Sequence, residues 1–264
     1  MKPLTERTTI AAALLVAGMA VSTSAAAVTW DMRNNDGCNG TGEPACSSSN
    51  GNTRVYTSGG VKLTVSAISD TGNATTSSGD SRPIESAYLG HYGGNGVGVT
   101  NQDESSGSPH HAVDNSNRFD AVRLEFDAAV RLTDVNFGWA SGDTDFTILY
   151  WTGPGSANLI GDTYGGLAPD WALLGHFDSF GTGDKSLGNA SLFSRYWLVM
   201  AYNDVFTGAS INLDGNGNNP DEGDDYFKLG KVGAAAETRK VPEPGSLALL
   251  GLGLAGLGLG RRRR

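Results

Sequence analysis

Acidic and amide side chains gather in two stretches of this sequence, and their oxygens could bind a cation. The first stretch covers residues 101–120 (NQDESSGSPHHAVDNSNRFD), and two further aspartates follow at 143 and 145. Carboxylate and amide oxygens grouped on loops suit Ca²⁺, which takes six to eight oxygen ligands. In the alternative interpretation, an Asx turn explains residues 114–115 and the acids are solvated. The predicted calcium ligands of this first set are Asp103, Glu104, Asp114, Asn115, Asp120, Asp143 and Asp145.

The second stretch, LDGNGNNPDEGDD over residues 213–225, has part of the pattern of an EF-hand calcium loop. Asparagine replaces the glycine expected at the sixth position, the twelfth position is Asp rather than Glu, and no flanking helices are predicted. It is therefore the weaker calcium prediction. Its candidate ligands, at loop positions one, three, five and twelve, are Asp214, Asn216, Asn218 and Asp225.

Residues that could act as catalysts do not fall into a recognised arrangement. His110 and His111 are adjacent, so on an extended chain they point to opposite sides, and the sequence has no Gly-x-Ser-x-Gly motif. Asp143 and Asp145 would share one face of a strand about 7 Å apart, which a glycosidase could use, but such pairs are more often metal ligands or solvent-facing. We therefore predict no catalytic residues and no enzymatic activity.

Strands must position these side chains, because the body of the chain alternates apolar and polar residues with a period of two. Two alternating runs, at 121–127 and 130–140, are separated by only two small residues, which predicts two strands. In DFTILYW (145–151) both faces are apolar, which predicts a central strand covered on both sides. Together the runs predict an all-β fold: one antiparallel β-sandwich or jelly-roll-like domain over residues 28–233, followed by a spacer at 234–240.

The charge of the body restricts its partners. Residues 28–240 include 26 acidic and 13 basic side chains, for a formal charge of −13. A surface this negative repels phosphate backbones, so we predict no nucleic-acid partner. It suits an exported protein, or one that collects divalent cations.

Both the N-terminus and the cysteines indicate export. Residues 1–27 combine two basic residues, a short apolar run (IAAALLVAGMAV) and a small-residue ending, as in a cleaved secretory signal peptide. In an exported protein the two cysteines, Cys38 and Cys46, are expected to form a disulfide across a tight loop. A metal pair is the alternative, but the spacing is wrong for a zinc knuckle and no other Cys or His lies nearby.

The C-terminus has three consecutive parts: a Pro-Glu-Pro motif, a short apolar segment and four arginines (VPEPGSLALLGLGLAGLGLGRRRR, residues 241–264). Residues 246–260 are shorter than the roughly 20 residues that span a bilayer, and their glycines weaken a helix. The arginines would stay on the cytoplasmic side. Pro242 and Pro244 favour an extended backbone around Glu243, which a processing enzyme could bind.

This tail resembles the PEP-CTERM signal recognised by exosortases in Gram-negative bacteria that make extracellular polysaccharide. The resemblance implies that exosortase removes or exchanges the tail, that its association with the membrane is transient, and that the mature protein lies in the envelope, on the outer surface or in the extracellular matrix of a biofilm. An ordinary single-span anchor is the alternative.

The body also resembles a family of exosortase-dependent surface proteins through GVGVTNQDE, HAVDN, FGW and DTDFTILYWTG. The function of that family is not established. We expect a non-enzymatic surface or matrix protein. The alternatives are a calcium-dependent carbohydrate-binding module of the polysaccharide layer, or a glycan hydrolase or lyase.

Overall fold

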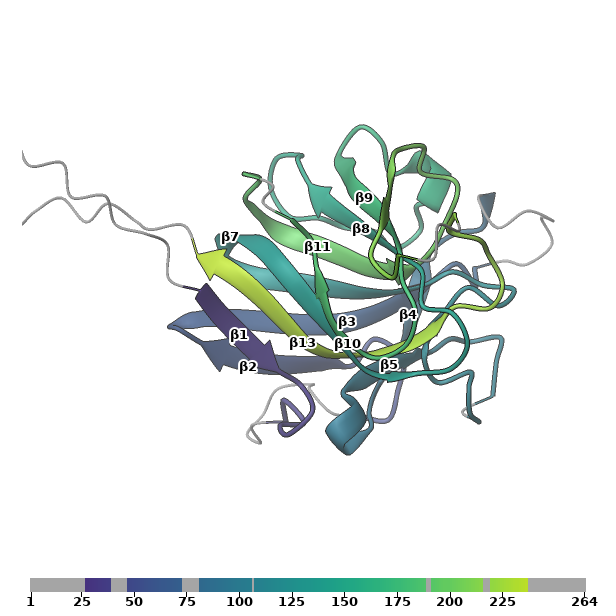
Figure 1. Ribbon diagram of the computed structural model, residues 1–264, viewed down its shortest axis with the longest axis horizontal. Coiled ribbons are helices and arrows are strands. Elements are labelled where there is room, and N and C mark those ends of the chain that lie inside the picture. The colour runs from purple at the N-terminus through teal and green to yellow at the C-terminus, as the bar shows by residue number, and fades with distance from the viewer. Residues whose placement is uncertain are drawn as a thin grey trace, which may run out of the picture.

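The computed structural model describes residues 27–38, 47–72, 81–105, 107–188, 191–215 and 219–236. In these ranges the chain is all-β, as predicted, with no α-helix and with short 3-10 turns that include η2 (Gly93–Asn95) and η3 (Tyr164–Gly166). The strands are β1 (Ala27–Asp31), β2 (Thr53–Ser58), β3 (Val61–Ser69), β4 (Glu85–His91), β5 (Val97–Thr100), β6 (Val113–Asp114), β7 (Asp120–Ala140), β8 (Phe146–Trp151), β9 (Trp171–Asp178), β10 (Gly183–Ser186), β11 (Ser194–Ala201), β12 (Ser210–Asn212) and β13 (Tyr226–Ala236) (Figure 1).

These strands form one continuous hydrogen-bonded sheet rather than two separate sheets. Its order is β1-β13-β5-β4-β3-β7-β11-β8-β9-β12, with β2, β6 and β10 attached to β3, β13 and β7. Among the named strands every pairing is antiparallel except that of β9 with β12. The predicted antiparallel arrangement is therefore nearly complete.

Strand β7 links the two parts of this sheet. Its first half pairs with β3 and β11, and its second half pairs with β13 and β10. The prediction of two strands here is wrong, because the two small residues Ala128 and Ala129 do not end the strand. The register of β11 shifts between Ser194 and Tyr196, opposite this point, and such an irregularity bends a strand without ending it.

A single large core lies between the two halves of β7 and the strands paired with them. Phe137 stacks on Phe227 with ring centroids 4.0 Å apart, and Phe146 stacks on Phe177 at 4.7 Å. Trp30 of β1 meets Phe126 edge-on at 5.0 Å. These aromatic contacts join strands that are far apart in the sequence, so the core holds the sheet in its curved form.

Strand β8 is covered on both faces, which confirms its prediction as a central strand. Phe146 and Ile148 belong to the large core, whereas Leu149 belongs to a second cluster. Loop residues between β8 and β9, including Leu159 and Tyr164, complete that second cluster.

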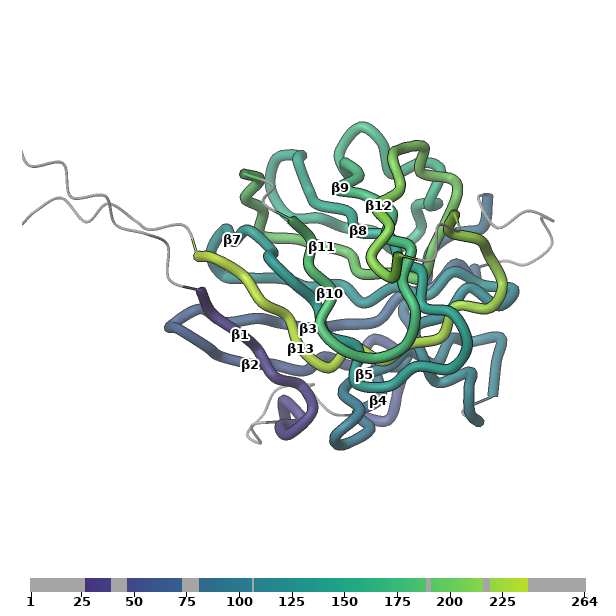
Figure 2. The backbone as a smooth tube through the Cα atoms, viewed as in Figure 1, coloured from purple at the N-terminus to yellow at the C-terminus, as the bar shows by residue number. Residues whose placement is uncertain are grey.

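The two described ends of the chain lie side by side. Ala27 of β1 is the register partner of Ala235 of β13, and Figure 2 shows both ends at the same side of the molecule. Strand β13 continues to Ala236, so residues 234–236 are strand and not part of the predicted spacer. The sequence AAA lacks alternation, but Ala234 and Ala235 are buried and pair with β1, which extends the strand.

The predicted signal peptide up to residue 26, the spacer from 237 onward, the sorting tail, Cys46, Asn216 and Asn218 lie outside the described residues. Within the described residues, no helix has the length and apolar character to cross a membrane.

The disulfide is testable in solution. Cys38 is not a free thiol in the structure, but Cys46 lies outside the described residues, so their pairing stays a prediction. We expect thiol labelling of the denatured, unreduced protein to modify neither cysteine, and labelling after reduction to modify both. Stoichiometric labelling before reduction would refute the pairing. Because the loop is short, reduction should cost at most about 2–3 kcal/mol of stability.

Candidate functional site

Two clusters of acidic side chains lie near Tyr226, the residue at which β13 begins. β6 places Asp114 opposite Tyr226, the first residue of β13, and Asp143 forms a parallel bridge with Asp225 immediately before it. The paired chain ends lie at the other end of the same strand. Eleven residues at about 3.3 Å each separate the clusters from those ends by roughly 35 Å.

The ligands predicted as one set separate into two clusters because Asp114 and Asn115 are neighbours on an extended chain. Successive side chains of such a chain point in opposite directions. Asp114 joins Glu104 and His110, whereas Asn115 bonds to Asp225 in the other cluster. The single predicted calcium set is therefore corrected to two separate groups.

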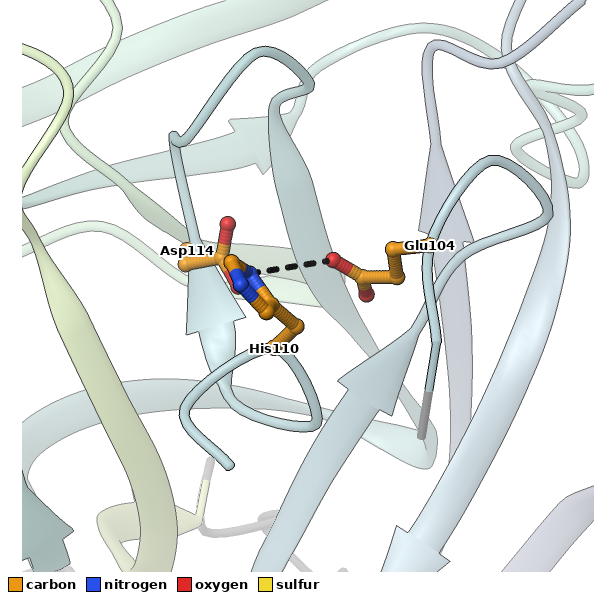
Figure 3. Close-up of side chains that lie close together, drawn as sticks. All are labelled: Glu104, His110 and Asp114. Carbon is orange, nitrogen blue, oxygen red and sulfur yellow. Dashed lines mark ion pairs between the residues drawn. The ribbon is translucent and has the colours of Figure 1, made fainter. Parts of the chain in front are cut away.

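The first group, called here the histidine cluster, consists of Glu104, His110 and Asp114. Figure 3 shows their side chains converging from two loop positions and from β6. The Nδ1 atom of His110 lies 3.9 Å from Oε2 of Glu104, and one ligand atom from each of the three side chains lies within 4.8 Å of the others. The backbone N–H of Asn101 donates to Oε1 of Glu104 at 2.9 Å, which fixes that carboxylate.

Burial makes the charged carboxylates of the histidine cluster costly. It raises the pKa of Glu104 to about 8 and that of Asp114 to about 7. Asp120 is completely buried beside them, and burial followed by the charge of Asp114 raises its pKa well above the usual range. A cation among these carboxylates would favour their charged forms.

The second group, called here the three-aspartate cluster, consists of Asp143, Asp145 and Asp225. Oδ1 of Asp225 accepts from the backbone N–H of Asp145 at 2.5 Å, and its Oδ2 accepts from Nδ2 of Asn115 at 2.6 Å. Oδ1 of Asp145 accepts from the backbone N–H of Ser179 at 2.7 Å. Ligand atoms of the three aspartates again lie within 4.8 Å of one another. All the offered ligands are oxygens, the type that Ca²⁺ prefers.

The carboxylates of the three-aspartate cluster are also hard to ionise together. Burial, followed by the charge of Asp145, raises the pKa of Asp225 to about 9. Burial raises the pKa of Asp145 to about 7 and also raises that of Asp143. Three carboxylates at this spacing therefore favour either bound protons or a bound cation.

The remaining predicted ligands have other roles. Asp103 forms an ion pair with Arg118 at the surface, so it does not join either cluster. Oδ1 of Asp120 accepts from Nδ2 of Asn101 at 3.2 Å, which places it behind the histidine cluster. Asp225 joins a cluster with Asp143 and Asp145, and not with other residues of the EF-hand-like stretch at 213–225. Asp214 contributes negative charge near Asp143 and Asp178.

His110 is the site residue that the sequence pattern missed. The histidines at 110 and 111 were excluded as a ligand pair, and the structure agrees that they diverge: the His111 ring packs against Tyr92 with centroids 4.5 Å apart. His110 instead meets Glu104 and Asp114. Only its position in a strongly acidic stretch could have indicated this.

A polar cavity of about 510 Å³ lies beside the histidine cluster. Amide, carboxylate, hydroxyl, imidazole and guanidinium groups form its walls. The lining residues are Asn101, Asp103, Glu104, Ser105, His110, Ser116, Asn117 and Arg118. The cavity therefore offers many hydrogen-bonding groups.

The comparisons with known proteins concern the tail. A family model described as the PEP-CTERM protein-sorting motif matches residues 240–264. No curated protein and no solved structure matches the chain. The predicted sorting signal is thus confirmed, and it indicates exosortase-dependent sorting to the cell envelope or surface. The match does not extend to the body of the chain, so a function for the body has to be argued from its structure.

Proposed function

We propose that this chain, which ends in a PEP-CTERM protein-sorting motif, is a non-enzymatic surface or matrix protein that exosortase processes after export through a secretory signal peptide. In this proposal the body is a calcium-stabilised β-domain. It is displayed on the outer surface or within the extracellular polysaccharide of a Gram-negative biofilm.

The observation that carries the proposal is the position of the tail relative to the fold. The sorting motif begins four residues after β13 ends at Ala236, beside the start of β1. Export and attachment therefore act at one end of the sheet. Both acidic clusters lie at the opposite end, roughly 35 Å along β13, where they would face away from the cell.

The non-enzymatic part of the proposal is supported by the surroundings of the histidines. Oγ1 of Thr147 lies 2.9 Å from Nδ1 of His176, a contact that resembles a nucleophile and its base. Both residues are buried, however, and Nε2 of His176 contacts the carbonyl oxygen of Phe206, so a substrate could not reach the pair. Nε2 of His91 likewise contacts the carbonyl oxygen of Met32.

A carbohydrate-binding module is the second candidate function, and the polar cavity beside the histidine cluster favours it. A glycan array, read with calcium and again with a chelator, tests for such binding.

A turnover assay on the producer's own polysaccharide tests the third possibility, a glycan hydrolase or lyase. Product release in that assay would overturn the proposed non-enzymatic function.

We expect calcium to stabilise the protein through the three-aspartate cluster. Extracellular modules bind calcium with Kd of about 10⁻⁴ to 10⁻³ M. At ten times Kd, binding to the folded state adds about 1.4 kcal/mol. In a domain of about 200 residues, this should raise Tm by about 3–6 °C. Differential scanning calorimetry in calcium and in chelator, at equal ionic strength, measures the shift.

Three variants assign that shift to its site. Asp143→Asn removes a ligand charge from the three-aspartate cluster and should abolish most of the calcium-dependent gain. Asp114→Asn, in the histidine cluster, and Asp162→Asn, at an exposed position, should both keep the gain. An unchanged melting curve in the wild type, or an equal loss in Asp162→Asn, would contradict calcium binding at this cluster.

A further inference from the structure

We propose that Glu104, His110 and Asp114 form a zinc-binding site, separate from the calcium-type cluster. The proposal does not depend on how the protein is sorted or on whether the three-aspartate cluster binds calcium.

The ligand set of the histidine cluster favours zinc over calcium. Zn²⁺ accepts imidazole nitrogen and carboxylate oxygen at about 2.0–2.2 Å, whereas calcium sites use oxygen ligands. The atom of His110 that faces Glu104 is a ring nitrogen, Nδ1. One imidazole with two carboxylates is a three-ligand set of the kind found in zinc sites that leave a fourth position open.

The distances between the ligand atoms of the histidine cluster are slightly longer than those in an occupied zinc site. In a tetrahedral site with 2.0–2.1 Å bonds, ligand atoms are about 3.3 Å apart. Here Nδ1 and Oε2 are 3.9 Å apart, and all three ligand atoms lie within 4.8 Å. The His110 side chain is 42% exposed, so it has room to rotate and close the remaining gap.

A buried oxygen without a partner is independent evidence for a ligand at this place. Asp114 has no solvent-exposed surface, and its Oδ1 accepts from the backbone N–H of Ser116 at 3.0 Å. Its Oδ2 is buried and has no hydrogen-bond partner. Buried polar atoms are rarely left unsatisfied in folded proteins, and a bound cation would satisfy such a carboxylate.

The local charge fits a divalent ion. Glu104, Asp114 and Asp120 are the three carboxylates that act on one another here. Lys228 is the positive group that attracts Asp114, and its ammonium is held 3.6 Å from the centroid of the Trp139 ring. With all four groups charged, the formal charge is −2, which one Zn²⁺ would neutralise.

The cavity gives this site access to solvent. Glu104 and His110 belong to the wall of the 510 Å³ cavity, so a metal between them could bind water or an oxygen of a polar ligand at its fourth position. Asp114 closes the cluster from the buried side.

Zinc titration of the untagged, chelator-treated protein tests the proposal. In isothermal titration calorimetry with calcium at saturation, we expect one equivalent of Zn²⁺ to bind. His110→Ala should weaken that binding at least about tenfold, as should Glu104→Gln, since even the loss of a group that only supports a ligand costs ten- to hundredfold. Asp143→Asn should leave zinc binding unchanged.

Each contrary result is informative. Absence of zinc binding in the wild type, while circular dichroism shows it folded, would overturn the site and indicate that the cluster holds protons. Equal zinc affinity in the wild type and in His110→Ala would place the ion elsewhere. Because His110 is at the surface, His110→Ala should fold normally, and its unfolding curve in chelator should match that of the wild type.

Discussion

Replacing Pro242, Glu243 and Pro244 together by alanine is expected to leave the C-terminal tail on the protein and to deplete the protein from the surface fraction. Proline restricts its own φ and disfavours helix in the residue before it, so the Pro-Glu-Pro motif predicts an extended segment that a processing enzyme can bind. Without processing, the chain keeps the apolar segment at 246–260 and should stay with the inner membrane, although this segment is shorter than a full bilayer span. This is the largest expected effect, because processing either occurs or does not.

Mass spectrometry of surface-localised and membrane-associated protein measures this outcome. The wild type should begin at or near Val28, end near Pro242–Pro244, and lack Arg264. Glu237→Ala is the matched control, since it removes an acidic side chain just before the residues that match the sorting motif. Recovery of intact Arg264 from surface-localised wild-type protein would refute processing.

Phe137→Ala is expected to lower the free energy of unfolding by about 3–5 kcal/mol, the usual cost of removing a buried phenylalanine side chain. Phe137 is 1% exposed, stacks on Phe227 and lies 5.1 Å from Phe146. It lies in the second half of β7, where the strand pairs with both β13 and β10. Total stabilities are about 5–15 kcal/mol, so this single loss should be severe.

Thermal unfolding followed by circular dichroism should show the effect as a Tm decrease of about 6–20 °C in a domain of about 200 residues. Phe180→Ala is the matched control, because Phe180 is 64% exposed and its truncation should change stability by less than about 0.5 kcal/mol. Equal Tm shifts in the two variants would contradict the assigned core.

The features that the sequence determined by itself are local or linear. A tail signal is read as a continuous string, so its motif, apolar segment and arginines could be recognised without a fold. Strand residues are also visible locally, because side chains alternate between the two faces with a period of two. The apolar residues on both faces of 145–151 correctly predicted a strand covered on both sides.

The features that only the tertiary structure decided depend on contacts between distant residues. Two alanines inside β7 look like a break in the sequence, yet β11 pairs with Glu125 before them and with Val130 after them, so the strand continues. Residues 234–236 look like a spacer, yet pairing with β1 makes them strand.

The acidic residues show the same limit most clearly. The composition of the acidic stretches indicated cation-binding loops, but it could not show which acidic residues belong to which of the two clusters. Asp114 and Asn115 separate because they point to opposite sides of the chain, and Asp225 joins Asp145 across 80 residues of sequence. His110 completes a cluster with Glu104 and Asp114 through the path of its loop. A ligand set is defined by convergence in space, which residue spacing specifies only within a single regular element.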